Sequence, residues 1–462
     1  MSNLFELDLS WNRLVYLEEG MFDGLASLRK LFLNGNYLNY SLKIPNDIFK
    51  PLVSLTYLNV AYNLLFREGY LFYTFPGDLL LPLVRLYKIE VDVRPRFQFF
   101  QFAEEYRTLT NLKRLKTGFC VLHHLTNITF TNLLYLEYIE MQTCWIQKFD
   151  RGTIPNRNYF RYLDISHNEL SDYDHDSLYS LMKELSFFKE LRGLKMTNSF
   201  PFVYIFKPGY LTFFLKSTKI EKLYVNNNSL VEAIGNNQLF MMPPTLRVCD
   251  FSNNRLSKFY FGMPYLSMLN LRNNTLGAYL SSKRYTNSSK TELREIDLSH
   301  NLIQDLSFDI FHGHAHAVKI NLSHNKLLDV SFDLSHLVSL ERLDLSYNNI
   351  SGITSKIAMD SLHKLSKTSN LTIDLSNNLL KCSCQNLKFL QWMYVNLNLL
   401  FNTDQYMCQF VGNGVVHMTN VEKIVKQLEK ECSSYTTVII CITTGILLAC
   451  VILVAGLVYR YR

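Results

Sequence analysis

The chain has 462 residues with a formal net charge of +7, and charged residues make up 19% of it. This length exceeds the roughly 100–200 residues of an ordinary domain, so either several domains or a repeat array is expected. A charge this small for the length argues against a dedicated nucleic-acid-binding protein, which clusters its Lys and Arg in one patch. The sequence also has no GxSxG, HExxH or phosphate-loop motif, so we expect neither an enzyme nor a cofactor.

A leucine-rich pattern of the form LxxLxLxxNxL recurs along the chain. Its first positions are Leu4, Leu28, Leu55, Leu112, Leu136, Phe160, Leu191, Ile220, Leu246, Leu266, Leu293, Ala317, Leu340 and Asn370. A weaker copy lies near "VRLYKIEVDV". Each LxL is expected to be a short strand with both apolar side chains in the core and the middle residue outside. The prediction is therefore an α/β leucine-rich-repeat solenoid, a horseshoe with a parallel sheet on its concave face, of about 14–15 repeats over residues 1–380.

Polar and sulfur-bearing residues occupy the ninth position of the pattern, which is the N of LxxLxLxxNxL. It is Asn in most repeats, and its amide can bond backbone groups that a tight turn leaves unpaired. In two adjacent repeats the position is Cys120 and Cys144. We expect these to be buried reduced thiols, with a disulfide as the alternative. Cys249 fills a core Leu position and is expected to be reduced.

Repeats of unusual length interrupt the array at 66–111, 171–190, 199–219 and 277–292, and such irregular surface often carries function. The Asp residues in the middle of many LxL strands are interpreted as solvated consensus positions. Basic residues gather on the middle strands instead and are the candidate contacts for an anionic lipid, a glycan or a nucleic acid. They are Arg114, Lys116, Lys195 and Lys222.

Histidines invite two further interpretations. The loop "HGHAH" at 312–316 could suggest a metal site, but alternate residues of a loop face opposite ways, so a solvated surface is favoured and no metal site is expected. His167, His300 and His324 precede the repeat Asn and could sense an endosomal pH. An ordinary repeat residue is the favoured explanation.

Eight N-x-S/T sequons are present, and their number fits a secreted or lumenal surface. They lie at Asn39, Asn127, Asn227, Asn273, Asn287, Asn321, Asn349 and Asn370. Asn321 lies between two core strand residues, so a glycan there would block the concave face.

Four cysteines follow the last repeat, at Cys382, Cys384, Cys408 and Cys432. The open end of a solenoid exposes its apolar core, so we expect residues 381–433 to form a cap in which "NLKFLQWMYV" is helical. Four cysteines allow three disulfide pairings. A zinc site is the less favoured alternative, because the spacing is wide. Disulfides would place the repeats in an oxidising compartment.

Residues 438–458, "VIICITTGILLACVILVAGLV", are uncharged and long enough to be predicted as a single transmembrane helix. A linker at 434–437 and a cytoplasmic tail beginning at 459–462 complete the expected type I topology, in the plasma membrane or an endosome. Gly445, Ala449 and Gly456 share one helix face at a spacing that lets two membrane helices pack. Their abundance in membrane helices generally is the alternative explanation.

This order of parts resembles a Toll-like receptor: long phenylalanine-bearing repeats, a "KCSC" cap, a short linker and a single span. The resemblance implies a pattern-recognition receptor of innate immunity that binds a microbial or endogenous ligand and pairs with itself or a like receptor to signal. The cap motif "NNLLKCSCQNLKFLQWM" resembles the C-terminal caps of extracellular leucine-rich repeats. It implies disulfides between Cys382 and Cys408 and between Cys384 and Cys432.

Two parts of that family are not seen in this sequence, the signal peptide and the cytoplasmic Toll/interleukin-1 receptor (TIR) domain. We therefore expect a fragment or a truncated form, with TIR adaptors as partners only if the missing domain exists. The alternatives are a leucine-rich-repeat adhesion receptor and a truncated decoy or co-receptor that lacks a signalling domain.

Overall fold

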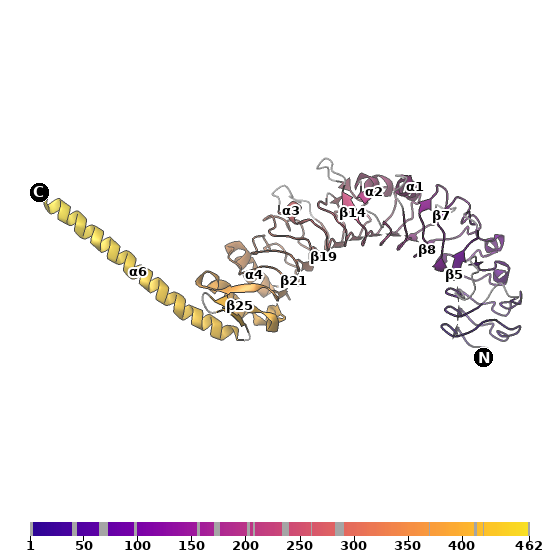
Figure 1. Cartoon of the computed structure of the whole chain (residues 1–462), viewed down its shortest axis with the longest axis horizontal. Coiled ribbons are helices and arrows are strands. Elements are labelled where there is room, and N and C mark those ends of the chain that lie inside the picture. Colours follow the sequence, from indigo (N-terminus) through magenta and orange to yellow (C-terminus); the bar gives the residue numbers. More distant parts are fainter. Residues whose placement is uncertain are drawn as a thin grey trace. The chain divides into compact units, whose positions relative to one another are not determined.

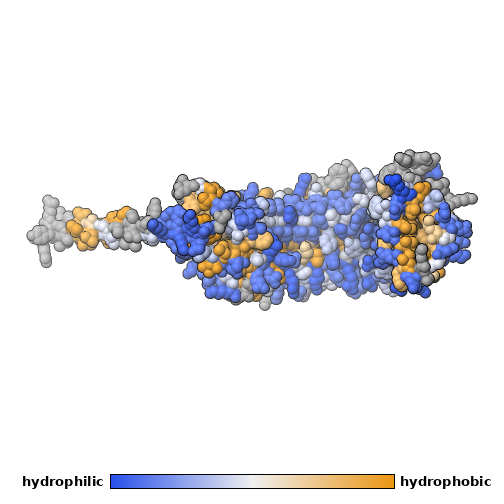
Figure 2. All heavy atoms as spheres, turned by 90° about the horizontal axis from the view of Figure 1, so that it is seen from below, coloured by the Kyte–Doolittle hydropathy of each residue, from blue (hydrophilic) through white to orange (hydrophobic). Residues whose placement is uncertain are grey.

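A computed structural model describes the chain apart from residues 1–2, 39–43, 64–72, 97–98, 155–157, 171–175, 201–203, 207, 233–239, 260, 282–290, 369, 411–413, 419 and 461–462. The described residues form two compact units, Met1–Asn274 and Thr275–Arg462. In each unit, consecutive repeats stack so that their strands lie side by side along one face (Figure 1). Hydrophilic residues cover most of the face seen in Figure 2, with hydrophobic residues in smaller groups.

Unit 1 contains a parallel sheet in which each repeat adds one short strand next to the previous one. In order these are β1 (Glu6–Asp8), β2 (Lys30–Phe32), β3 (Tyr57–Asn59), β5 (Lys88–Arg94), β6 (Arg114–Cys120), β8 (Tyr138–Glu140), β10 (Tyr162–Asp164), β11 (Gly193–Lys195), β13 (Lys222–Tyr224), β16 (Val248–Asp250) and β18 (Met268–Asn270). The weak repeat "VRLYKIEVDV" supplies β5, so it belongs to the sheet.

The connections of unit 1 contain smaller elements. The 3₁₀ helices are η1 (Asp78–Leu80) and η2 (Glu104–Thr108), and the α-helices are α1 (Asp176–Leu185) and α2 (Pro208–Leu215). Strand β4 (Tyr73–Thr74) pairs antiparallel with β5. Three parallel pairs lie outside the main sheet: β7 (His124–Leu125) with β9 (Lys148–Phe149), β12 (Tyr204–Phe206) with β14 (Leu230–Glu232), and β15 (Phe240–Met241) with β17 (Phe261–Gly262).

Unit 2 repeats this plan and adds the cap. Its main strands are β19 (Glu295–Asp297), β20 (Lys319–Asn321), β21 (Arg342–Asp344), β22 (Thr372–Asp374) and β24 (Leu400–Phe401), with helices α3 (Gly277–Leu280) and α4 (Lys356–Thr368) in the connections. The cap contains β23 (Leu379–Cys382), η3 (Cys384–Asn386), α5 (Leu387–Val395), η4 (Leu397–Leu399), η5 (Thr403–Gln405), β25 (Met407–Phe410), β26 (Gly414–His417) and the start of α6 (Val421–Arg460).

Asparagines hold neighbouring repeats together as expected. Asn254 is buried, and its amide nitrogen donates to the carbonyls of Val225 and Phe251 at 3.0 and 2.9 Å. Its amide oxygen accepts the N–H of Leu230 at 3.2 Å. One side chain thereby bonds backbone groups of its own repeat and of the preceding one. Nearly all the repeat asparagines are buried in the same way: Asn36, Asn63, Asn168, Asn228, Asn254, Asn274, Asn301, Asn325, Asn348 and Asn378.

The prediction of reduced thiols at Cys120 and Cys144 was wrong, because the structure joins them in a disulfide. Equivalent positions of adjacent repeats are spaced like neighbouring strands, about 4.8 Å apart. The two Cα atoms lie 4.4 Å apart, within the range that a disulfide spans. Repeat stacking therefore brings the two thiols together. Cys249 is free and buried, and burial raises the pKa of its thiol.

The cap covers the last repeat with the helix α5. Phe389, Leu390 and Trp392 are buried in it, which removes the apolar end of the solenoid from water. The structure places Cys382 with Cys408 and Cys384 with Cys432 in two disulfides.

Helix α6 departs from the expected linker and span. Residues 434–437 lie inside this continuous helix, because no Pro or Gly interrupts the chain between Cys432 and Gly445. Among the residues that the structure describes, no helix is long and apolar enough to cross a membrane, so the span predicted at 438–458 is not supported. Gly445 and Ala449 lie in the described part of α6. At Gly445, no described atom outside the helix lies within 4 Å of the position that a Cβ would occupy. Position 456 lies outside the part of α6 whose side chains the structure describes.

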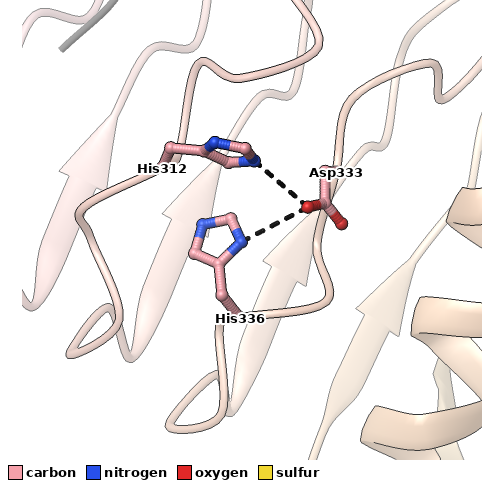
Figure 3. Close-up of side chains that lie close together, drawn as sticks. All are labelled: His312, Asp333 and His336. Atoms are coloured by element: carbon pink, nitrogen blue, oxygen red, sulfur yellow. Dashed lines mark hydrogen bonds and ion pairs between the residues drawn. The ribbon is translucent and has the colours of Figure 1, made fainter. Parts of the chain in front are cut away.

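The "HGHAH" loop is not uniformly solvated, contrary to the prediction. His314 is buried, and this burial lowers the pKa of its imidazole to about 4. Its Nδ1 lies 2.6 Å from the hydroxyl of Thr291. His312 is half-exposed and points toward Asp333 and His336 of the next repeat (Figure 3). His316 is exposed. The loop contacts its neighbouring repeat, so its histidines differ in environment.

Candidate ligand-binding surface

The outward residues of the strands form two rows across the middle of unit 1. The parallel register aligns Lys88, Arg114, Tyr138, Tyr162, Gly193 and Lys222 in the first row. It aligns Glu90, Lys116, Glu140, Asp164, Lys195 and Tyr224 in the second. Tyrosines and charges of both signs therefore share one face, which we call the tyrosine face.

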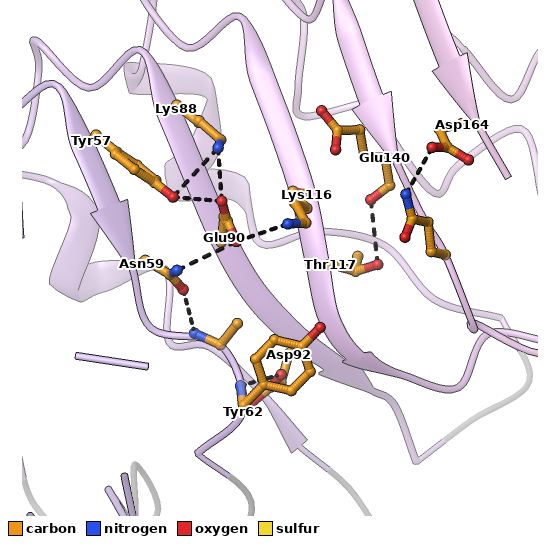
Figure 4. Close-up of polar contacts among 12 residues, drawn as sticks. Tyr57, Asn59, Tyr62, Lys88, Glu90, Asp92, Lys116, Thr117, Glu140 and Asp164 are labelled. Atoms are coloured by element: carbon orange, nitrogen blue, oxygen red, sulfur yellow. Dashed lines mark hydrogen bonds and ion pairs between the residues drawn. The ribbon is translucent and has the colours of Figure 1, made fainter. Parts of the chain in front are cut away.

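Glu90 is the centre of a polar network on this face (Figure 4). Its carboxylate accepts the hydroxyl of Tyr57 at 2.5 Å and pairs with Lys88 at 2.7 Å and with Lys116 at 3.5 Å. Burial opposes ionisation of Glu90, but hydrogen bonds from Lys88 and Tyr57 and both lysine charges outweigh it. The pKa of Glu90 is therefore lowered. The network fixes the side chains in place before any ligand arrives.

Aromatic rings continue the face toward β11. The guanidinium of Arg114 lies 4.1 Å from the ring centre of Tyr138, and the rings of Tyr138 and Tyr162 are 6.3 Å apart. A Cβ at Gly193 would come within 2.4 Å of the ring of Tyr162. The absence of a side chain at Gly193 thus lets Tyr162 lie across the next strand and widen the aromatic area.

The four basic residues proposed as ligand contacts do lie on neighbouring strands, but they do not form a patch of free cations. Lys116 pairs with Glu90, and Lys195 pairs with Asp164 at 3.5 Å. Arg114 stacks on Tyr138, and Lys222 is exposed. Carboxylates therefore pair with two of the four positive charges.

Asp92 is a structural residue next to this network that the sequence did not single out. Its buried carboxylate accepts the backbone N–H groups of Tyr62, Asn63 and Phe119 at 2.8, 2.9 and 2.6 Å. Burial is the largest influence on its pKa and raises it. Asp92 thereby ties together three repeats beside the Glu90 network. The alternation "KIEVDV" could have indicated a strand here, but no pattern indicated a buried carboxylate.

The other strand aspartates are structural rather than merely solvated. Asp297 accepts the N–H of Ser299 at 2.9 Å, which closes the turn that follows the strand. The equivalent hydrogen bond, from the backbone N–H two residues further along the chain to the carboxylate, is made by Asp8, Asp164, Asp250, Asp344 and Asp374. Asp164 and Asp374 are buried.

The sequons occupy different environments. Five are exposed: Asn127, Asn227, Asn273, Asn349 and Asn370. Asn39 and Asn287 lie outside the described residues. Asn321 is half-buried on β20, where its amide nitrogen lies 3.2 Å from the Asp297 carboxylate and its oxygen accepts the Ser323 N–H at 3.0 Å.

Comparisons with known proteins agree with this architecture. The family model for the leucine-rich repeat matches residues 1–38 and 291–350. In an alignment 283 positions long, which covers 54% of this chain, the sequence is 31% identical to Toll-like receptor 4 of Pinctada imbricata. The chain has the leucine-rich-repeat fold and resembles the Toll-like receptors. The match covers 28% of that relative, so the chain spans less than a third of its length.

Among solved structures, the mouse RP105/MD-1 complex is similar to 88% of this leucine-rich-repeat chain and to 72% of its own, with a TM-score of 0.51. The identity is 16%, so this likeness concerns the fold alone.

Proposed function

We propose that this chain is the recognition part of a pattern-recognition receptor of innate immunity. Its repeats bind a microbial or endogenous ligand, and pairing with itself or a like receptor leads to signalling. The relative and the disulfides, which require an oxidising compartment, support a membrane receptor with extracellular or lumenal repeats. Because the structural neighbour is described as a complex, an accessory chain on the repeats is also part of the proposal.

The tyrosine face is the observation that carries the proposal. Tyrosine offers a large apolar ring with a polar end, which suits recognition of a ligand that has both apolar faces and hydroxyl groups. Lys116 and Lys195 are already paired, so a polyanion would have to compete with Glu90 and Asp164. We therefore favour a microbial glycan over a nucleic acid as the ligand of this face.

Binding of defined probes to the whole chain in detergent tests this function. The probes are soluble peptidoglycan fragments, lipopolysaccharide, lipoteichoic acid and a synthetic double-stranded RNA. We expect a glycan-containing probe to bind, and Tyr162→Ala to weaken it about 10-fold or more, as loss of ~1.4 kcal/mol of stacking would. Tyr159→Ala is the matched control, because Tyr159 is also an exposed tyrosine but lies before the repeat strand that carries Tyr162.

Two outcomes would contradict the proposal. Equal losses for Tyr162→Ala and Tyr159→Ala would remove the tyrosine face from recognition. Binding of the RNA alone, with an affinity that falls steeply as salt is raised, would show a polyanion site instead of a glycan site.

A further inference from the structure

Two histidines and one aspartate converge between consecutive repeats of unit 2. His312 Nε2 lies 3.1 Å from Asp333 Oδ2, and His336 Nδ1 lies 3.6 Å from the same oxygen (Figure 3). The three atoms all lie within 4.8 Å of one another. Two imidazole nitrogens and one carboxylate oxygen are a ligand set that Zn²⁺ prefers.

The distances suit a tetrahedral ion. With metal–ligand bonds of about 2.0–2.1 Å, neighbouring ligand atoms of a tetrahedral zinc site are about 3.3 Å apart. The two measured separations from Asp333 bracket this value. The remaining gap between the histidines can close by rotation of the His312 ring, whose side chain is 44% exposed.

The hydrogen bond on the far side of His336 determines its tautomer. His336 Nε2 lies 2.6 Å from the backbone carbonyl of Phe311, which can only accept, so Nε2 carries the hydrogen. In the neutral ring, Nδ1 then presents its lone pair to the Asp333 carboxylate. Two electron-rich atoms facing each other need a proton on Nδ1 or a metal ion in its place, and a Zn²⁺ ion would also draw in His312. A histidine that donates its other N–H to a carbonyl is the usual arrangement around protein-bound zinc.

Contacts that do not involve the ion hold Asp333 and the backbone segments that carry the ligands in place. The second carboxylate oxygen of Asp333 accepts the N–H of Ser335 at 2.8 Å. Phe311 and Phe332 immediately precede His312 and Asp333, and their buried rings lie 5.4 Å apart. Core packing therefore sets the spacing of the two ligand-bearing loops before any ion binds.

We propose that His312, Asp333 and His336 bind one Zn²⁺ ion, with water at the fourth position on the exposed side of His312. The ion would cross-link the loops of two consecutive repeats, a role comparable to that of the Cys120–Cys144 disulfide in unit 1. This site is separate from the tyrosine face, so it does not depend on the proposed receptor function.

Titration of the whole metal-free chain with ZnCl₂, followed by calorimetry and by thermal unfolding, tests the site. Co²⁺ substitution adds a spectroscopic readout, because tetrahedral Co²⁺ absorbs visible light more strongly than octahedral Co²⁺. We expect one ion per chain and a raised melting temperature. His312→Ala should weaken binding by about 10-fold or more, since even loss of a supporting residue costs 10–100-fold.

His316→Ala is the matched control, because His316 is an exposed histidine of the same loop outside the cluster. Its affinity should stay within about twofold of the unmodified chain. Asp333→Asn provides a second variant whose amide oxygen can still accept the Ser335 N–H, and it should also lose the ion. No saturable binding by the unmodified chain would overturn the proposal. So would equal losses in His312→Ala and His316→Ala, or binding unchanged by both His312→Ala and Asp333→Asn.

Discussion

Replacing one repeat asparagine tests how neighbouring repeats are held together. In Asn254→Ala, the N–H of Leu230 loses its partner. The carbonyls of Val225 and Phe251 each lose one hydrogen bond, although they still accept from Asn228 and Asn274. A buried hydrogen bond contributes a net ~1 kcal/mol, and an orphaned group can cost more. The three losses together therefore destabilise this part of unit 1 by about 3 kcal/mol.

Hydrogen exchange of the Leu230 amide measures the effect at the site itself. Stability in a repeat array is a sum of local terms, so the loss should appear mainly in this repeat and its neighbours. About 3 kcal/mol corresponds to roughly 100-fold faster exchange, at 1.4 kcal/mol for each factor of ten.

Asn253→Gly is the matched control. Asn253 is the adjacent residue and has a φ of 54°, a left-handed conformation that glycine adopts without strain. It gives up only an exposed bond from Asn273. Protection of Leu230 should remain within about threefold of the unmodified chain, a change of ~0.7 kcal/mol. Equal exchange rates in the two variants would refute the reasoning.

Three further predictions concern particular side chains. Peptide mapping without reductant should recover Cys120 joined to Cys144, and finding both as free thiols in folded protein would contradict the stacking argument. Glycopeptide analysis should find Asn349 modified and Asn321 unmodified, because the Asn321 amide is engaged on β20; a glycan on Asn321 in folded chain would speak against this geometry. The lowered pKa of Glu90 means that its ion pairs stabilise the fold above the usual carboxyl value of 4.5, and this stability is lost as the pH falls through the lowered pKa. The difference in unfolding free energy between the unmodified chain and Glu90→Gln should thus be largest near pH 7 and shrink below pH 4.5, and a pH-independent difference would exclude this linkage.

The repeat pattern was sufficient to predict the solenoid, because Leu periodicity and the repeat Asn both act within one or two neighbouring repeats. Asn254 illustrates this, since each of its partners lies in its own or the preceding repeat. The Cys120–Cys144 disulfide depends on the distance between stacked repeats, which the spacing of the two cysteines along the chain does not contain.

Sites built between repeats were harder to predict. The charge of Lys116 and Lys195 is compensated by Glu90 and Asp164, and each partner belongs to a different strand. The loop "HGHAH" was interpreted alone, whereas His312 meets residues more than twenty positions further along the chain. Cross-repeat contacts of this kind depend on register and rotamer, which one-dimensional spacing does not contain.

The central claim is that the tyrosine face recognises a ligand and that this recognition starts signalling. A reporter assay tests it most directly: the chain is joined to a membrane helix and the Toll/interleukin-1 receptor domain of a relative, in cells that carry a reporter of that pathway. Peptidoglycan fragments, lipopolysaccharide and lipoteichoic acid are applied in turn. The account predicts activation by at least one of them, lost in Tyr162→Ala and retained in Tyr159→Ala. Activation that is equal in both variants, or absent with every probe while the chain is folded at the cell surface, would contradict it.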